Sequence, residues 1–314
     1  EIQNKTEEKY SVLMADIREK VRERKINPDT LIRVSSDSLK ANFNHIYILG
    51  SEKSNLVKKL ISNFTTLEEI STTISNGIST SCDKVYIVNG ETVKKHKIEH
   101  LVAKKTIRGS NFNRYWIDDK VDDFVVYITN KTVKEEIPKA MAYLEPYKEL
   151  LIERSIEKKQ GKREWHILFR PREESDYVTP KILIRQTADK IIAALDSKDG
   201  YYPIDTVNIV KLKSIDIDLN LLILGILNSK LISFFYQEIS QEGGRILAQV
   251  KPSRVKAIPI PELRDSQNIS ALVSTIIKLK KVGKETILEE AQIDQLVYEL
   301  YGLTEEEIRI VEGE

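Results

Sequence analysis

Short runs of β-branched and apolar residues, separated by turn-forming residues, occupy the middle of the chain. Between Pro180 and Val210 this pattern predicts three strands, at residues 181–184, 191–195 and 206–210. Glycine, aspartate and proline separate the runs, and Asp199-Gly200 is the clearest turn. We therefore expect the three strands to form an antiparallel meander.

The first of these strands ends in a polar triplet, Arg185-Gln186-Thr187. A guanidinium, an amide and a hydroxyl are groups with which proteins read base edges and bind phosphates. A polar strand end without any ligand would look the same, and the triplet taken alone favours that simpler interpretation.

Helical periodicity marks most of the other apolar segments. Apolar residues three and four positions apart predict helices at 6–25, 54–64, 139–159, 269–281 and 285–301, with a buried helix at 219–236. Further strands are expected within 30–50 and at 84–88, 121–129, 167–169 and 257–260. Asn89-Gly90 is expected to form a hairpin turn, and Gly302 to end a helix before a last short one. Together these elements predict a mixed α/β (α+β) fold with antiparallel-rich sheets, flanking helices and a helical C-terminal segment.

Composition places the chain among ordinary globular proteins. Its 314 residues are 41% hydrophobic and 31% charged, which suffices for one large or two ordinary domains with a core. No apolar run approaches the roughly 20 residues that cross a bilayer, and residues 1–30 lack the apolar segment of a signal peptide. The single cysteine, Cys82, excludes an intramolecular disulfide and fits a reducing compartment. We expect a cytoplasmic protein without a membrane partner and, because the chain starts at Glu1, a fragment of a longer one.

Charge is distributed unevenly along the chain. Residues 285–314 hold ten acidic residues against one basic residue, a net charge of −9. Because the whole chain has a net charge of +1, residues 1–284 have a net charge of +10. Such asymmetry suggests a polyanionic partner for the basic part, although a solvated basic face would give the same count.

Basic residues concentrate in two segments. Residues 94–120 contain eight Lys or Arg against three acids, interleaved with Tyr115 and Trp116, a mixture that suits nucleic acid. A second group lies at the end of the predicted 139–159 helix, where the helix macrodipole also favours positive charge. The candidate cations are Lys104, Lys105, Arg108, Arg114, Lys158, Lys159, Lys162 and Arg163.

Two glycine-containing segments complete the candidate binding residues. A serine- and threonine-rich loop is expected to offer backbone amides and hydroxyls to phosphates, unless it is only part of a hairpin. Its candidate residues are Ser75, Asn76, Gly77, Ser79 and Thr80. A glycine turn, Gly243-Gly244, is expected to present Arg245.

Motifs for catalysis are missing from the sequence. His96 and His100 are four positions apart, but no glutamate follows His96 and only one thiol is present, so no metal site is expected. The chain has no Gly-x-Ser-x-Gly, no Gly-x-Gly and no P-loop. Pro28-Asp29 and Glu157-Lys158-Lys159 contain the letters of a nuclease core but lie far apart. The residues indicate a binding surface without catalytic residues.

Eight segments in one order carry a resemblance to a known family. They are GISTSCDKVYIV, LVAKKTIRGSNFNRYW, YLEPYKELLIERSIEKKQGKREWHIL, PKILIRQTA, GYYPIDTVNIV, LLILGILNSKLISFFY, GGRILAQVKPSRVKAIPIP and IDQLVYELYGLTEEEI. From about residue 35 to its end, the chain resembles the C-terminal specificity domain of adenine-specific DNA methyltransferases of the TaqI kind. Single-chain type II restriction-modification enzymes with a fused nuclease and methylase carry this domain too.

The resemblance implies a target-recognition domain that faces a methyltransferase core, in the same polypeptide, across double-stranded DNA. The whole enzyme would use S-adenosylmethionine to methylate a flipped adenine, and magnesium if a nuclease is fused. The family's Asn-Pro-Pro-aromatic motif is absent, since Asn27-Pro28 is followed by Asp29, so no catalytic or cofactor-binding residue is carried over. Residues 1–34 would be a helical tail of the methylase region or a linker, 35–265 the recognition domain, and 266–314 a helical segment packed on it.

Within this interpretation the cations and the Ser75–Thr80 loop would hold the DNA backbone. The triplet 185–187 and Arg245 would read base edges. Three alternatives remain open: a specificity subunit of a multi-subunit restriction system, a complete nuclease or methylase with degenerate motifs, and a protein-interaction module that uses the basic face.

Overall fold

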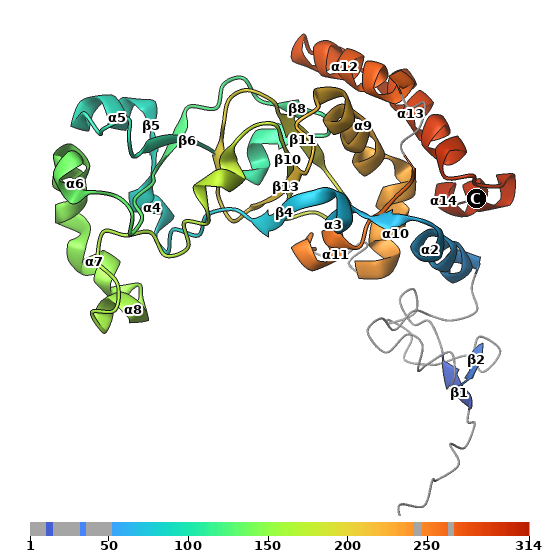
Figure 1. Ribbon diagram of the computed structural model, residues 1–314, viewed down its shortest axis with the longest axis horizontal. Helices are drawn as coiled ribbons and strands as arrows, with labels where there is room; N and C mark the ends of the chain where they lie inside the picture. Colours follow the sequence, from blue (N-terminus) through green and yellow to red (C-terminus); the bar gives the residue numbers. More distant parts are fainter. Residues whose placement is uncertain (1–10, 15–31, 36–51, 241–246, 263–266, 314) are drawn as a thin grey trace, which may run out of the picture.

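The computed structural model describes residues 11–14, 32–35, 52–240, 247–262 and 267–313. This part of the chain confirms the mixed α/β class. Figure 1 shows a central group of strands, with helices α4 to α8 at one end of the molecule and α9 to α14 with α2 at the other.

The first described elements are two strands, β1 (Ser11–Met14) and β2 (Ile32–Ser35). They pair antiparallel, with Val12 opposite Val34. The helix predicted at 6–25 is therefore wrong at 11–14, where pairing between β-branched residues prevails over helical spacing.

The central sheet has four antiparallel strands in the order β11-β10-β13-β4. The strands are β4 (Ser71–Asn76), β10 (Lys181–Arg185), β11 (Ala193–Asp196) and β13 (Val207–Leu212). The three predicted strands of 181–210 are present, but they do not form a meander because β10 lies between its two successors. Ile182, Leu183 and Ile184 are fully buried, which fits an inner strand that is covered on both faces and paired with a neighbour along each edge.

A second sheet has the order β12-β6-β9-β5, and its buried side chains belong to a second hydrophobic core. Its strands are β5 (Ile87–Asn89), β6 (Ala103–Ile107), β9 (Asp123–Val126) and β12 (Tyr202–Pro203). The strand predicted at 84–88 is half helix, because α4 (Asp83–Tyr86) precedes β5. Asn89-Gly90 is not a hairpin turn: the Asn89 side chain accepts the Thr92 N–H at 2.9 Å and caps α5 (Gly90–His96).

Helices predicted as single elements are divided in the structure. The 139–159 helix is α6 (Pro138–Leu144), the 3-10 turn η4 (Glu145–Tyr147), α7 (Lys148–Glu153) and α8 (Ile156–Lys159). Pro146 has no N–H for a helical bond, which explains the break at η4. No strand is formed at 167–169, and the strand predicted at 257–260 is shortened to β14 (Pro259–Ile260), which pairs with β3 (Thr65–Thr66).

The apolar segment 219–236 forms two buried helices, α9 (Ile217–Asn228) and α10 (Lys230–Ser240), which meet at 60°. The Asn228 side chain bonds both the N–H and the C=O of Ala193, at 3.0 Å each, and the Ser229 hydroxyl accepts the N–H of Ile232. These contacts fix the break without glycine or proline. In the described part of the chain no single helix is long and apolar enough to span a membrane, and only this bent pair passes that test, by length and composition.

The C-terminal segment packs on α9 and α10. It consists of α12 (Gln267–Lys281), α13 (Ile287–Leu300) and α14 (Glu305–Glu312). Gly302 ends α13 with a φ of +59°, and α14 follows it, as the sequence indicates. The Thr304 side chain caps α14. Gly225 of α9 lets α12 approach closely, since a Cβ there would lie 2.7 Å from Ile269.

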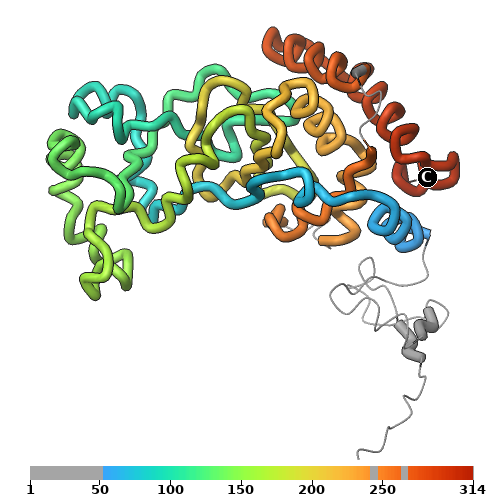
Figure 2. Tube along the Cα trace, in the orientation of Figure 1, coloured from blue at the N-terminus to red at the C-terminus, as the bar shows by residue number. Residues whose placement is uncertain are grey.

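The last helix lies beside the first helix of the main body, α2 (Glu52–Asn63). Figure 2 shows α2 beside the C-terminal helix, and Lys59 of α2 forms an ion pair with Glu307 of α14 at 2.6 Å. The C-terminal segment is thus part of the same folded body.

Candidate functional site

Three strand ends meet at an open hollow of about 410 Å³. Arg108 follows β6, Arg185 ends β10, and Thr206 precedes β13. The lining residues are Arg108, Gly109, Ser110, Arg185, Thr187 and Thr206. Arg108, Arg185 and Thr187 were predicted as binding residues from distant parts of the sequence, and the fold brings them together.

A glycine permits the close packing on one side of the hollow. The Gly109 N–H donates to the Thr206 hydroxyl at 3.1 Å. A Cβ at Gly109 would lie 2.9 Å from the Thr206 carbonyl oxygen and 3.2 Å from Arg185 Cγ. The Asn111 side chain accepts the Arg108 N–H at 2.8 Å, which fixes the turn that carries Arg108.

Arg185 is held from one side only. Its Nη2 donates to the carbonyl oxygen of Phe112 and, at 2.9 Å, to Oδ1 of Asn113, and its guanidinium lies over the Phe112 ring. Arg185 Nε is buried without a hydrogen-bond partner among the described residues. Burial lowers the pKa of Arg185, but an arginine stays charged at neutral pH. Of its five N–H donors, those of Nη1 therefore remain for a ligand.

Arg108 is held by two carboxylates at longer range. Its Nη1 lies 3.7 Å from Asp83 and its Nε lies 3.6 Å from Asp123. Because all three side chains are partly exposed, these ion pairs are weak and exchangeable. The fold therefore orients the Arg108 side chain, and its guanidinium can exchange these carboxylates for a ligand.

The rest of the triplet is placed by its backbone. The Gln186 N–H donates to the Thr206 carbonyl at 2.9 Å, and its C=O accepts the Val250 N–H at 2.7 Å. Thr187 is exposed and bridges to Gln249. Gln249 thus lies beside the hollow. Gly243, Gly244 and Arg245 lie outside the described residues.

The segment predicted as a phosphate-binding loop is ordered backbone. Ser75 and Asn76 pair with β13, and the Gly77 N–H donates to the Val207 carbonyl at 2.8 Å. A Cβ at Gly77 would lie 2.3 Å from two carbonyl oxygens, so the glycine serves packing. Ser79 bridges to Arg170, and the buried Thr80 hydroxyl bonds Asp83. The segment is therefore partly strand and not the open loop that was expected, while contact of these residues with DNA stays a prediction.

The predicted cations near α8 divide into internal and exposed groups. Lys158 is buried and donates to the Tyr86 hydroxyl at 3.2 Å, and burial, with the nearby Arg163 charge, lowers the pKa of Lys158 to about 8. Arg163 bonds Glu157 and the carbonyl oxygens of Leu168 and Phe169. Lys159 and Lys162 are exposed.

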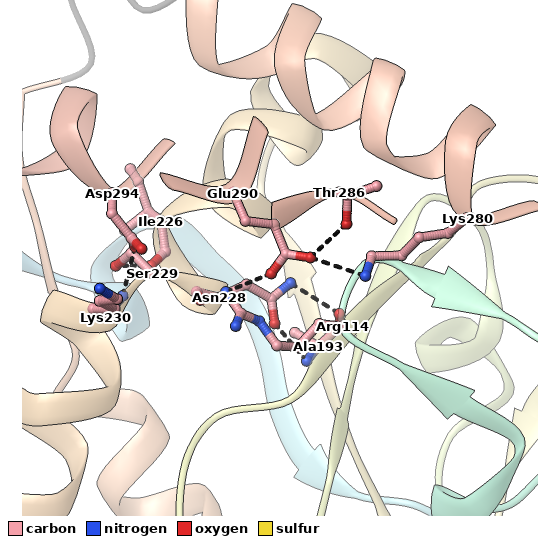
Figure 3. A network of polar contacts seen from close by, with 10 residues as sticks. All are labelled: Arg114, Ala193, Ile226, Asn228, Ser229, Lys230, Lys280, Thr286, Glu290 and Asp294. Carbon is pink, nitrogen blue, oxygen red and sulfur yellow. Dashed lines mark hydrogen bonds and ion pairs between the residues drawn. The ribbon is translucent and has the colours of Figure 1, made fainter. Parts of the chain in front are cut away.

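Three more predicted cations come from β6 and the hairpin that follows it. Lys105 is exposed. Lys104 lies 3.6 Å from Glu174 and over the Tyr202 ring. Arg114 contacts the C-terminal helices, where its Nη2 lies 3.1 Å from Glu290 (Figure 3).

Sequence reasoning missed three residues of this region, Ser110, Thr206 and Asn113. Each is a small polar residue at the end of a short strand or turn, next to a residue that was predicted. That position was the available signal, but it becomes specific only when the fold aligns the strand ends.

Comparison with known proteins assigns the fold to a family. Residues 104–260 match the model of the TaqI-like C-terminal specificity domain. Among solved structures, the chain is similar to the type IIL restriction-modification enzyme MmeI, solved in complex with DNA, with a TM-score of 0.53, 14% identity, and coverage of 74% of this chain and 33% of that chain. It is also similar to the type IIG restriction endonuclease BpuSI, with a TM-score of 0.46, 13% identity, and coverage of 89% and 37%. The chain thus spans about a third of the length of either, and the likeness to MmeI shows the fold alone.

The family match includes every residue that lines the hollow and half of the chain. The fold, the order of the eight segments and the family match agree. The chain belongs to the family of TaqI-like C-terminal specificity domains.

Proposed function

We propose that this chain recognises a short sequence in double-stranded DNA as the target-recognition part of a restriction-modification enzyme. The observation that carries the proposal is the meeting of Arg108 and Arg185 with the Ser110, Thr187 and Thr206 hydroxyls in one open hollow. Family membership supports it, since the hollow lies within the matched residues.

The chemistry of the hollow suits a base edge beside a phosphate. A guanidinium that keeps one nitrogen free can donate to guanine O6 and N7, and hydroxyls can bond any base. Because Phe112 and Asn113 already hold Nη2 of Arg185, its orientation is set before DNA arrives. We assign base reading to Arg185, assisted by Thr187, and a phosphate contact to Arg108, whose carboxylate partners are weakly bound.

Exposed lysines would supply sequence-independent affinity. Lys105, Lys159 and Lys162 are exposed and would each release counterions on meeting a phosphate. Lys158, Arg163 and Arg114 are assigned no DNA contact, because they already serve internal partners.

The activity of a whole enzyme is a further part of the proposal. The described residues contain no group of three or more His, Cys, Asp or Glu that could hold a metal ion, and the sequence lacks the adenine-binding motif. We therefore assign methyl transfer from S-adenosylmethionine, and magnesium-dependent cleavage if a nuclease is fused, to other parts of a longer cytoplasmic protein. Methyl transfer would supply the chemistry, while residues of this chain would position the target sequence.

Selection from random DNA tests the function directly. The chain is incubated with duplexes carrying a randomised segment, the bound fraction is sequenced, and the dissociation constant of the selected duplex is measured by anisotropy at two salt concentrations. We expect a defined sequence to emerge and the affinity to fall as salt rises.

Two arginine-to-alanine variants, one in the hollow and one outside it, are compared. R185A should lose preference at one base pair, at a cost of about 1–3 kcal/mol, whereas R309A, an exposed arginine on α14 outside the matched residues, should keep it. No binding to any duplex, or binding without sequence preference, contradicts the proposal and favours a protein-interaction module.

A further inference from the structure

One small hairpin contacts both the hollow and the C-terminal helices. It consists of β7 (Phe112–Asn113), the turn residues Arg114 and Tyr115, and β8 (Trp116–Ile117). Its first strand provides both acceptors for Arg185 Nη2. Its turn contacts α9 and α13 through Arg114. The hairpin is therefore a direct physical link between the two regions.

The turn of this hairpin has a constrained backbone. Tyr115 has a φ of +69°, a left-handed conformation that is unfavourable for a bulky residue. The Tyr115 N–H donates to the Ala193 carbonyl at 2.8 Å, and its ring is buried in the larger core. Such a conformation persists only where the surroundings hold it, so the contacts of Arg114 beside it matter for its shape.

Glu290 is the centre of those contacts (Figure 3). Its carboxylate forms an ion pair with Arg114 Nη2 at 3.1 Å, and it accepts from Lys280 Nζ at 2.9 Å and from the Thr286 hydroxyl at 2.7 Å. Burial alone would raise the pKa of Glu290, but the hydrogen bonds from Lys280 and Thr286 and the Arg114 charge bring it below its ordinary value. The carboxylate is therefore ionised at neutral pH.

Arg114 depends on this carboxylate. Its Nη2 also donates to the Asn228 carbonyl at 2.6 Å, at the C-terminal end of α9, where helix dipoles favour a cation. Its Nε is buried without a hydrogen-bond partner among the described residues. Loss of the Glu290 charge would remove the ion-pair partner of the partly buried Arg114 side chain, which is 30% exposed, and would leave its buried Nε and the Asn228 carbonyl contact uncompensated by a carboxylate. Moving the turn toward solvent would relieve that cost.

We propose that Glu290 is a positioning residue for DNA recognition: through Arg114 and the 112–117 hairpin, it sets the direction in which Arg185 faces the hollow. The inference rests on the proposed function. A base-reading group must be held within about 0.5 Å of its productive position, so a small movement of Phe112 and Asn113 misdirects Arg185. The C-terminal helical segment is in this way part of the recognition apparatus without touching DNA.

A double-mutant cycle separates this role from simple packing of α13. The full chain is made as E290Q, R185A and the double variant, with E285Q as a control that removes one exposed carboxylate from the same segment. Dissociation constants are measured for the duplex that the wild-type chain selects and for the same duplex with the base pair read by Arg185 exchanged.

E290Q should weaken binding of the selected duplex by roughly three- to tenfold and bind the exchanged duplex as the wild-type chain does. In the R185A background E290Q should have no further effect, and it should leave the salt slope unchanged because no phosphate contact is lost. E285Q should match the wild-type chain. An additive loss in the R185A background, or equal weakening for both duplexes, would overturn the inference.

Asn113→Ala keeps the test valid if E290Q does not fold. The Asn113 side chain is exposed, and its removal deletes one acceptor of Arg185 without disturbing the core. N113A should reproduce the loss of preference, and an unchanged preference would overturn the inference. If the wild-type chain selects no sequence, the proposed function itself fails.

Discussion

Replacing Asp196 by alanine is expected to destabilise the fold by about 3–5 kcal/mol. Asp196 and Lys181 form an ion pair at 2.6 Å, and both side chains have no exposed surface. The pair joins the end of β11 to the start of β10, whose other end carries Arg185 at the hollow. The perturbation therefore tests what holds the strand that presents the proposed base-reading residue.

The magnitude follows from what each partner loses. Asp196 also accepts the N–H groups of Asp199, Gly200 and Tyr201, at 3.0, 3.2 and 2.8 Å. Alanine removes these acceptors and leaves the Lys181 ammonium fully buried with one neutral acceptor, the Tyr177 carbonyl. An uncompensated buried charge accounts for most of the expected loss, since breaking a buried pair from one side costs about 3–5 kcal/mol.

The pH dependence gives the prediction a definite sign. Burial lowers the pKa of Lys181, and the Asp196 charge partly opposes this, so D196A should lower the pKa further. A lysine whose folded pKa lies below its unfolded value of about 10.4 destabilises the fold most at low pH, and the penalty disappears as pH rises. The deficit of D196A against the wild-type chain should therefore shrink between about pH 7 and pH 9.5.

Urea unfolding followed by circular dichroism at both pH values measures this difference. D199A, which removes an exposed carboxylate from the same turn, is the control and should change stability by no more than about 0.5 kcal/mol. The reasoning is refuted if D196A costs less than about 1 kcal/mol at pH 7, or if its deficit grows with pH.

Three further predictions concern packing, titration and DNA affinity. Gly77→Ala should cost about 1–3 kcal/mol in urea unfolding, because the new Cβ would lie 2.3 Å from the carbonyl oxygens of Pro203 and Ile204. The pKa of Lys158 is about 8 in the folded chain, so the wild-type chain should gain stability as pH rises from about 8 toward the unfolded lysine pKa. K158M should lack the part of that gain that is due to Lys158. Equal gains in both chains would contradict a lowered pKa for Lys158. K105A should weaken DNA binding equally for all sequences and reduce the salt slope by about one, as read from anisotropy titrations at several salt concentrations.

Elements specified by local signals could be predicted from the sequence. Gly302 has the left-handed backbone that ends its helix, and a last short helix follows it, both as expected. The strand at 181–184 is also where its apolar run indicates. Neighbouring residues determine these features, so a local pattern is sufficient.

Long-range contacts determined what the sequence did not reveal. No glycine or proline stands at the break between α9 and α10, at residues 228–230. The break depends on Asn228 bonding to Ala193 and on the Lys230 N–H bonding to Asp294. Similarly, the order of strands in the central sheet depends on β10 pairing with β11 along one edge and with β13 along the other. Partners distant in sequence leave no local trace.

The candidate site shows the same division. The residue types of Arg108 and Arg185 indicated binding, and both line the hollow. Arg114, Lys158 and Arg163 are cations too, but their charges serve internal contacts. Counting charges cannot separate the two groups, because pairing is a property of the folded chain.

Pairing inside the molecule also changes the meaning of the charge asymmetry. The acidic segment 285–314 carries −9, and its carboxylates pair with cations of the preceding +10 region. The pairs are Arg114–Glu290, Lys280–Glu290, Lys59–Glu307 and Lys230–Glu312. Each such cation is unavailable to a DNA phosphate, so the basic excess that the sequence shows exceeds the charge that DNA would meet. Affinity would then come from Arg108 and a few exposed lysines and stay modest. Discrimination between sequences would depend on how firmly the fold orients Arg185. This makes the helical segment relevant to recognition in two ways, since it neutralises cations away from the hollow and holds the hairpin that directs the arginine within it.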